Sequence, residues 1–197
     1  MNRTAYVNGE FIPLKDAKIS ILDRGFLFAD GIYEVSAVLD GRLVDKDAHM
    51  QRLQRSVGEI QLSLPETLER TIEIQIELIR RNNLTEGIVY IEVTRGVADR
   101  DFVFPKDTRP TLVMFTQEKR IVDSPAAIMG IAVKSVPDIR WARRDIKSVG
   151  LLAQVLAKQA AQAENCQEAW MVEDGFVTEG GSSSAFIITT DRVLITR

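Results

Sequence analysis

The chain reads DRGFLFADGIYE over residues 23–34, and this stretch separates two patterns that predict β-hairpins. Asn8-Gly9 lies within the β-prone run 5–12, and Asp40-Gly41 lies within the β-prone run 32–44. Both dipeptides favour the tight primed turns that join adjacent antiparallel strands. The glycine-rich first part of the quoted stretch is predicted to be an irregular connector, because glycine weakens helices and strands alike.

Two helices are predicted after the second hairpin. Apolar residues recur at intervals of three and four over residues 50–60, which indicates one buried face of a helix that begins near Asp47. Ser63 and Glu66 match a capping box, so the second helix is predicted to start there and to run to about Asn83. Isoleucines within this segment alternate as in a strand, but the segment is longer than strands usually are, and we favour a helix.

The second half of the chain alternates strands and a helix. Strands are predicted over 88–94 and 111–116, then over 128–133, followed by an arginine-rich loop. A helix over 150–164 and further strands from Glu168 to the end complete the pattern. We therefore expect a mixed α/β (α+β) fold.

Three parts of the chain are predicted from these patterns. Residues 1–117 form an N-terminal small α/β domain, 118–125 a connector, and 126–197 the start of a second domain. About 70 residues are few for an independent core, so the second domain is expected to be incomplete.

Composition narrows the class of protein. The 197 residues are 45% hydrophobic, and 25 Lys+Arg against 28 Asp+Glu give a net charge of −3, which disfavours nucleic acid as a partner. Cys166 is the only cysteine, so the sequence offers neither a second cysteine for a disulfide nor the several Cys and His ligands of a zinc site. The N-terminus shows neither a signal peptide nor a membrane segment, and we expect a cytoplasmic protein.

Taken alone, the candidate chemical groups have ordinary explanations. Lys147 could be a solvated loop lysine, although Arg140, Arg143 and Arg144 upstream and Arg52, if it folds nearby, would surround an anion and lower the pKa of a nearby amine. A solvated basic surface would show the same pattern.

Other candidates are equally open. Glu179 at a strand end precedes Gly180, Gly181 and three serines, whose backbone could approach a ligand or form a flexible loop. His49 is the only histidine, so we discard a Ser-His-Asp triad and a zinc site.

Together, these pieces resemble the class IV aminotransferases of pyridoxal-phosphate fold type IV. The resemblance covers nearly the whole chain and rests on motifs in the family's order: Asp23-Arg24-Gly25-Phe26 with Phe28-Ala29-Asp30-Gly31-Ile32-Tyr33-Glu34, His49-Met50-Gln51-Arg52-Leu53, Thr94-Arg95-Gly96, Asp145-Ile146-Lys147-Ser148, and Thr178-Glu179-Gly180.

The resemblance implies roles for the cofactor site. Lys147 would form the Schiff base with pyridoxal 5'-phosphate and then move the substrate proton. Glu179 would pair with the protonated pyridine nitrogen. Arg52 would anchor the phosphate, and Ser183 and Arg140 would belong to the cofactor site.

The resemblance also implies a substrate site. Tyr33 and Tyr90 would line it, and Arg100 would bind the substrate carboxylate, with part of the site lent by the neighbouring subunit of a homodimer. The motif spellings are most similar to D-amino-acid transaminases, which exchange an amino group between D-alanine or D-glutamate and a 2-oxo acid. Phe102 stands where those enzymes carry a histidine, which weakens the carboxylate site.

Three alternatives remain. A branched-chain L-amino-acid aminotransferase and an aminodeoxychorismate lyase would share the fold, and a truncated chain could be a non-catalytic fragment that binds anions or takes part in assembly. Family chains continue beyond residue 197, and their later part completes the phosphate site. We therefore expect this sequence to be a fragment of a longer enzyme.

Overall fold

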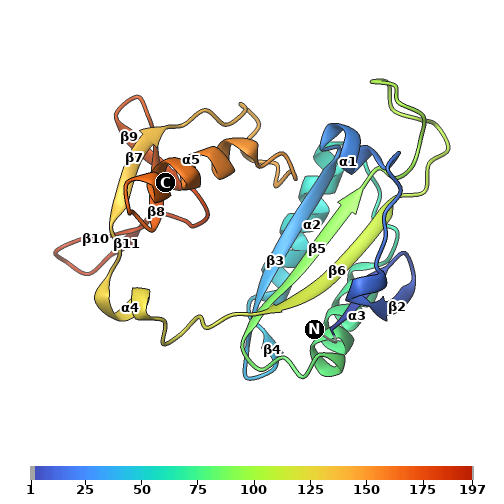
Figure 1. The fold of residues 1–197 in the computed structure, drawn as a ribbon, viewed down its shortest axis with the longest axis horizontal. Helices are drawn as coiled ribbons and strands as arrows, with labels where there is room; N and C mark the ends of the chain where they lie inside the picture. Colours follow the sequence, from blue (N-terminus) through green and yellow to red (C-terminus); the bar gives the residue numbers. More distant parts are fainter. Residues whose placement is uncertain (1–2, 197) are drawn as a thin grey trace. The chain divides into compact units, whose positions relative to one another are not determined.

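The computed structural model describes residues 3–196, which form two compact units (Figure 1). One contains the chain up to Val122 together with Asp145–Val149, and the other contains Asp123–Arg144 and the chain from Gly150 onward. The structure thus differs from the predicted division, because the segment around Lys147 packs on the first unit. Within residues 3–196, no helix is both long and apolar enough to cross a membrane.

A six-stranded sheet forms the first unit, and every neighbouring pair of strands is antiparallel. The strand order is β2-β1-β6-β5-β3-β4. The bounds are β1 Thr4–Val7, β2 Glu10–Pro13, β3 Gly31–Leu39, β4 Arg42–Leu43, β5 Gly87–Thr94 and β6 Thr111–Glu118.

Both predicted hairpins are confirmed. Asn8 and Gly9 have φ values of 48° and 106°, and Asp40 and Gly41 have 49° and 71°. These left-handed conformations are the ones that primed turns require, and asparagine, aspartate and glycine adopt them at low cost. Local turn chemistry therefore accounts for both connections.

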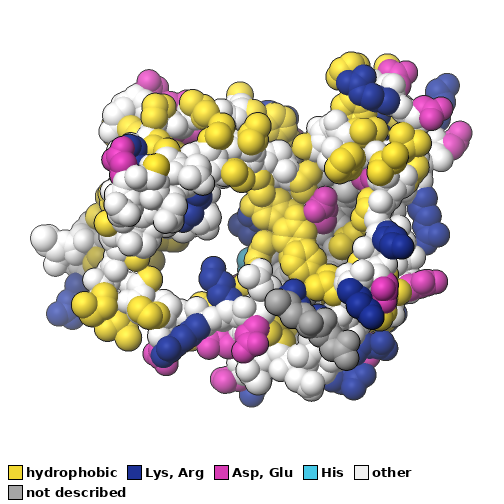
Figure 2. Space-filling model, in the orientation of Figure 1, with side chains coloured by type: hydrophobic (Ala, Val, Ile, Leu, Met, Phe, Trp, Pro, Cys, Tyr) yellow, Lys and Arg dark blue, Asp and Glu magenta, His cyan; other side chains and the backbone are white. Residues whose placement is uncertain are grey.

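Helices α2 (Lys46–Glu59) and α3 (Leu68–Arg81) cover one face of this sheet. The apolar stripe of α2 is buried as predicted, with Met50, Leu53 and Val57 in the main core. Side chains of β3 alternate between buried and partly exposed, so Ile32 faces this core while Tyr33 faces away from it. Figure 2 shows hydrophobic side chains gathered over the sheet in the first unit.

The structure corrects two predictions in this unit. The first part of the stretch 23–34 was predicted to be irregular, but it contains the short helix α1 (Arg24–Phe28). The Asp23 carboxylate caps this helix by accepting the Gly25 N–H at 2.8 Å. Helix α3 begins after Thr67, not at the predicted Ser63 box, because the Thr67 hydroxyl caps the Arg70 N–H. A 3₁₀ turn, η1, covers Leu14–Asp16.

The second unit contains a three-stranded sheet with the order β7-β8-β9. β7 and β8 are parallel and joined through α5, while β8 and β9 are antiparallel. Ala157 and Ala161 of α5 pack against Ala169 and Met171 of β8. The bounds are α4 Pro125–Met129, β7 Val133–Pro137, α5 Leu152–Ala163, β8 Glu168–Glu173, β9 Phe176–Gly180, β10 Ile187–Ile188 and β11 Leu194–Ile195.

Predictions for the second unit are partly confirmed. Helix α5 and the strand from Glu168 are present, but the strand predicted over 128–133 is wrong. Its first residues belong to α4, which Ser124 caps by accepting the Ala127 N–H, and β7 begins only at Val133. The end of the chain, where further strands were predicted, forms the short hairpin of β10 and β11, and Arg197 lies outside the described residues.

Replacing Gly96 with alanine is expected to destabilise the first unit. Gly96 has a φ of 92°, and an added Cβ would lie 2.0 Å from the carbonyl oxygen of Arg109. Strain of this kind costs about 1–3 kcal/mol, and the backbone clash adds to it. Urea denaturation followed by circular dichroism measures the loss.

Gly58 provides the matched control. It lies in α2, and an added Cβ there would meet no atom within 4 Å. Gly58→Ala should leave the free energy of unfolding unchanged or raise it by up to about 1 kcal/mol. Equal stabilities of the two variants would contradict the strain assigned to Gly96.

Candidate active site

The segment that carries Lys147 pairs with the edge of β3. The Tyr33 N–H donates to the Lys147 carbonyl at 3.0 Å, the Val149 N–H donates to the Gly31 carbonyl at 3.1 Å, and Ser148 forms a bridge with Ile32. β4 pairs only with the far end of β3 and leaves this edge open. The lysine therefore has a backbone position set by the sheet.

Helix α2 holds the same segment from the other side. The Lys147 N–H donates to the Ser56 hydroxyl at 3.4 Å, and Arg55 Nη2 donates to the Asp145 carbonyl at 2.6 Å. Ile146 inserts into the main core and is 5% exposed. The buried Ile146 side chain anchors a segment that sequence analysis could describe only as a loop.

The amine of Lys147 contacts Tyr33. Its Nζ lies 3.1 Å from Tyr33 Oη and 4.2 Å from the centre of the tyrosine ring. Among residues 3–196, no carboxylate forms an ion pair with this amine. The amine is therefore held by a tyrosine hydroxyl and ring and not by a carboxylate.

Arg52 forms a bidentate pair with a buried carboxylate. Its Nε and Nη2 donate to Glu34 at 2.8 Å and 2.6 Å, and His49 Nδ1 lies 3.1 Å from the same carboxylate. Burial alone would raise the pKa of Glu34, but hydrogen bonds from Arg52, His49 and the Val35 N–H lower this pKa to about 2. Glu34 is therefore ionised at neutral pH.

Tyr90 lies beside Tyr33 on the sheet face opposite α2. Their rings stack with centres 5.8 Å apart, and Tyr90 also stacks on Phe115 at 4.9 Å. The Tyr90 hydroxyl donates to Glu92 at 2.8 Å. Burial raises the pKa of both Tyr90 and Glu92, so this face combines aromatic surface with groups that favour their neutral forms.

Arg100 lies on the loop between β5 and β6. Its guanidinium is 5.3 Å from the centre of the Phe28 ring and 5.4 Å from that of Phe102, and no carboxylate among residues 3–196 pairs with it. Phe102 is 75% exposed. Arg100 is therefore a cation held only by aromatic rings, which leaves its N–H groups for an anion.

A buried ion cluster supports this loop. Asp30 accepts Arg24 Nε and Arg95 Nε, both at 2.8 Å. Arg24 Nη1 also donates to the Asp101 carbonyl at 2.5 Å, and the Arg95 guanidinium lies 3.6 Å from the centre of the Phe104 ring. The cluster connects the Thr94-Arg95-Gly96 motif to the Asp23-Arg24-Gly25 motif.

The second unit contains the remaining candidates. Glu179 is half-buried in β9 opposite Met171 of β8. The Ser183 hydroxyl donates to Glu168 at 2.9 Å, and the Gly180 N–H donates to the Ser183 carbonyl at 2.8 Å. The loop after Glu179 is therefore ordered by hydrogen bonds, in contrast to a simple flexible linker.

The arginines near Lys147 in the sequence have acidic partners. Arg140 Nη2 lies 2.8 Å from Asp138, and Arg144 donates to Glu173 at 2.5 Å. Hydrogen bonds from Arg140 contribute most to lowering the pKa of Asp138. Asp138 occupies Nε and Nη2 of Arg140, so Arg140 would bind an anion through Nη1 unless these bonds are exchanged.

Contacts bring only some candidates together. Tyr33 contacts both Tyr90 and Lys147, and Arg52 binds Glu34, the residue after Tyr33 in β3. These four candidates lie in the first unit, whereas Glu179, Ser183 and Arg140 lie in the second. Sequence analysis missed the role of Glu34. A charged residue at a core-facing position of a strand is the signal that could have identified it, because buried charges are nearly always paired.

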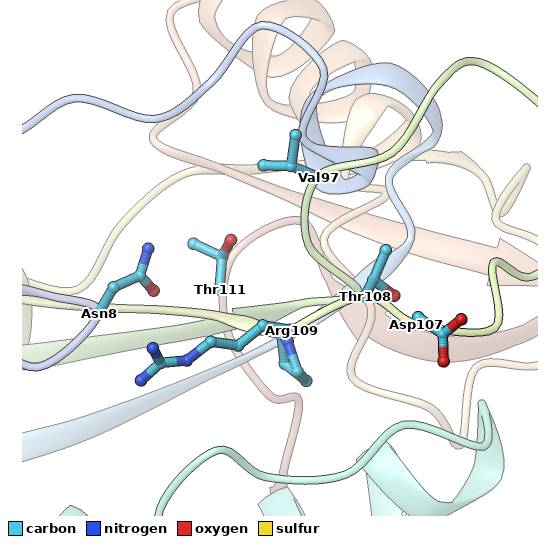
Figure 3. A pocket seen from close by; sticks show the side chains of 7 residues that line it. Asn8, Val97, Asp107, Thr108, Arg109 and Thr111 are labelled. Carbon is cyan, nitrogen blue, oxygen red and sulfur yellow. The ribbon is translucent and has the colours of Figure 1, made fainter.

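A cavity of about 310 Å³ lies elsewhere, beside the start of β6 (Figure 3). Its lining residues are Asn8, Val97, Asp107, Thr108, Arg109, Pro110 and Thr111. None of the candidates above lines it. Within residues 3–196 no group of acidic, histidine or cysteine side chains is arranged to hold a metal ion.

The chain is similar to known aminotransferases in both sequence and fold. The sequence pattern of the family described as "Amino-transferase class IV" matches residues 31–197. D-alanine aminotransferase of Staphylococcus haemolyticus is 43% identical over 186 residues, a match that covers 93% of this chain and 65% of that protein. The chain thus spans slightly less than two thirds of the length of this relative.

Two solved structures show the same fold. The branched-chain amino acid aminotransferase of Escherichia coli superposes with a TM-score of 0.88 at 21% identity, covering 100% of this chain and 68% of that one. A hypothetical aminotransferase from Mycobacterium tuberculosis, in a PLP-bound form, superposes with a TM-score of 0.78 at 20% identity, covering 98% and 70%.

Proposed function

The chain belongs to the class IV aminotransferases, enzymes that use pyridoxal phosphate, and we propose that it transfers an amino group between a D-amino acid and a 2-oxo acid. The observation that carries this proposal is the position of Lys147, which contacts Tyr33 of β3 and is held by α2, the helix that also carries Arg52. The Lys147 amine donates to the Tyr33 hydroxyl. Helix α2 carries both Arg52 and Ser56, and the Ser56 hydroxyl accepts the backbone N–H of Lys147.

These residues fit the cofactor. Pyridoxal phosphate supplies an aldehyde that condenses with amines, a phosphate dianion, and a ring that accepts electrons when a proton leaves the substrate. Lys147 offers the amine, and Arg52 Nη1 offers N–H donors without a partner among residues 3–196. Guanidinium groups bind phosphate through such donors.

Lys147 has two tasks in this proposal. Its amine would hold the cofactor by its aldehyde group, and the free amine would accept the proton that leaves the substrate α-carbon. The Tyr33 hydroxyl, 3.1 Å from Nζ, orients the amine for both tasks. A primary amine suits them because it is both a nucleophile and a general base.

The second unit contributes further groups. We assign Glu179 to the ring nitrogen, where a carboxylate holds a proton in place. Ser183 and Arg140 are assigned to the cofactor site as supporting residues, and their bonds to Glu168 and Asp138 fix their present positions.

Substrate and assembly follow from the same proposal. The D-alanine aminotransferase relative favours a D-amino acid such as D-alanine or D-glutamate, and Arg100 is assigned to the substrate carboxylate, with Tyr90 lining the pocket. Phe102 cannot donate a hydrogen bond to that carboxylate. We further propose a homodimer, for which light scattering should give twice the chain mass of 22.1 kDa.

A spectroscopic half-reaction tests the function. Protein loaded with pyridoxal phosphate is mixed separately with D-alanine, L-alanine and L-leucine, and the loss of its visible absorption band is followed. We expect D-alanine to remove the band and a 2-oxo acid to restore it. Conversion by an L-amino acid alone would contradict D-specificity, and protein that never acquires the band would contradict the aminotransferase itself.

A further inference from the structure

Glu34, the residue after Tyr33 in β3, has a carboxylate that is buried in the first unit. Glu34 lies on the face of β3 that packs against α2, the same face as the buried Ile32 and Val38. Its side chain is 0% exposed. A buried charge is costly unless donors surround it. The structure therefore has to supply those donors, and their origin shows what Glu34 does.

The donors come from α2 and from the backbone of β3. Arg52 donates twice, at 2.8 Å and 2.6 Å, His49 Nδ1 lies at 3.1 Å, and the Val35 N–H donates at 2.9 Å. Glu34 thus joins one side chain of the helix, Arg52, to the sheet through two parallel bonds. This pairing fixes the plane of the guanidinium, which four rotatable side-chain bonds would otherwise leave free.

The bidentate pair leaves one end of Arg52 available. Nε and Nη2 are occupied, Nη1 has no partner among residues 3–196, and the side chain is 44% exposed. A guanidinium bound on one edge and free on the other presents its free donors in a set direction. Such a group is preorganised for an anion because little conformational entropy is lost on binding.

The same framework supports the amine. Tyr33, next to Glu34 in β3, contacts Lys147 Nζ, and Ser56, one helical turn after Arg52, accepts the Lys147 N–H. One strand and one helix thus set the positions of both the amine and the guanidinium. Glu34 is the buried link between that strand and that helix.

We infer that Glu34 is a positioning residue that holds the Arg52 guanidinium in the orientation that binds the phosphate of the cofactor. This inference rests on the proposed function, because it takes Arg52 as the phosphate ligand. A simple counter-ion would behave in the opposite way. Removing the charge of a counter-ion would make the site more positive and strengthen phosphate binding, whereas removing a positioning residue weakens it.

Equilibrium binding of pyridoxal phosphate and of pyridoxal, which lacks the phosphate, separates these cases. Titrations followed by absorbance give the ratio of the two affinities for wild type, Glu34→Gln and Arg52→Ala. We expect Glu34→Gln to weaken pyridoxal phosphate binding by about 10–100-fold, the usual effect of losing a residue that orients a ligand-binding group. Pyridoxal binding should change far less, which shows that the fold and Lys147 are intact.

Additivity gives a second readout. In an Arg52→Ala background, Glu34→Gln should cause no further loss that depends on the phosphate, because the residue it positions is gone. Glu77→Gln is the matched control, since Glu77 pairs with Arg80 at 2.7 Å on the exposed face of α3. It should leave both affinities unchanged.

Glu34→Asp covers the case in which Glu34→Gln does not fold. It keeps the buried charge but retracts the carboxylate by one methylene, so a loss specific to the phosphate form is still expected. The inference is overturned if a folded Glu34 variant binds pyridoxal phosphate as tightly as wild type, or more tightly, while Arg52→Ala still weakens pyridoxal phosphate binding. If Arg52→Ala has no effect in the first place, the assignment of Arg52 in the proposed function fails, and the inference fails with it.

Discussion

Lys147→Ala is expected to abolish transamination and to remove the visible absorption band of protein loaded with pyridoxal phosphate. In the proposed function, Lys147 would both hold the cofactor aldehyde and move the substrate proton. Loss of the proton transfer alone slows a reaction by about 10²–10⁴-fold. Loss of cofactor attachment adds to this, so activity should fall below detection in a coupled assay for pyruvate formed from D-alanine.

The structure of the segment predicts that this variant folds. The backbone bonds to Tyr33 and Ser56 and the buried Ile146 do not involve the lysine side chain beyond Cβ. Lys46→Ala is the control, because Lys46 is a surface lysine paired with Asp47. Full activity in Lys147→Ala, or equal loss in Lys46→Ala, would be incompatible with the assignment of Lys147.

A small primary amine added to Lys147→Ala gives a sharper result. Such an amine can supply the missing base in solution, although without the positioning that Tyr33 gives to Nζ. We expect partial recovery of the half-reaction with D-alanine that rises with amine concentration. No recovery in a variant that still binds the cofactor phosphate would show that the lost function is not proton transfer.

Glu179→Gln is expected to have the second largest effect. The amide keeps the shape of the side chain but carries no charge, so it no longer favours a proton on the ring nitrogen of the cofactor. Loss of one charged group that stabilises the transition state costs about 10²–10³-fold in kcat. Steady-state kinetics with D-alanine, combined with measurement of bound cofactor, separates this effect from loss of binding.

Glu179→Asp tests whether the charge itself is required. It retains the carboxylate in β9, at the position opposite Met171, and should keep more activity than Glu179→Gln. For Glu179→Gln, kcat should fall by a larger factor than the amount of bound cofactor does. Comparable activity of the wild type and Glu179→Gln would remove Glu179 from the proposed mechanism.

Sequence analysis was most successful where local chemistry decides the structure. The turns at Asn8-Gly9 and Asp40-Gly41 and the apolar stripe of α2 depend on neighbouring residues alone. It failed where short apolar runs are ambiguous. Ile128 and Met129 read as a strand, yet Ser124 and Pro125 start a helix there.

By itself, the sequence determined the family and the identity of the groups available for chemistry, since the motifs around Tyr33, Arg52, Lys147 and Glu179 are read directly from the order of residues. Only the tertiary structure decided how they are held. The open edge of β3 receives the Lys147 segment, and Glu34 binds Arg52 from the core. These contacts join residues far apart in the chain, so their energies depend on the packing of α2 against β3. The sequence shows only a charged residue at a core-facing position of β3 and does not identify its partner.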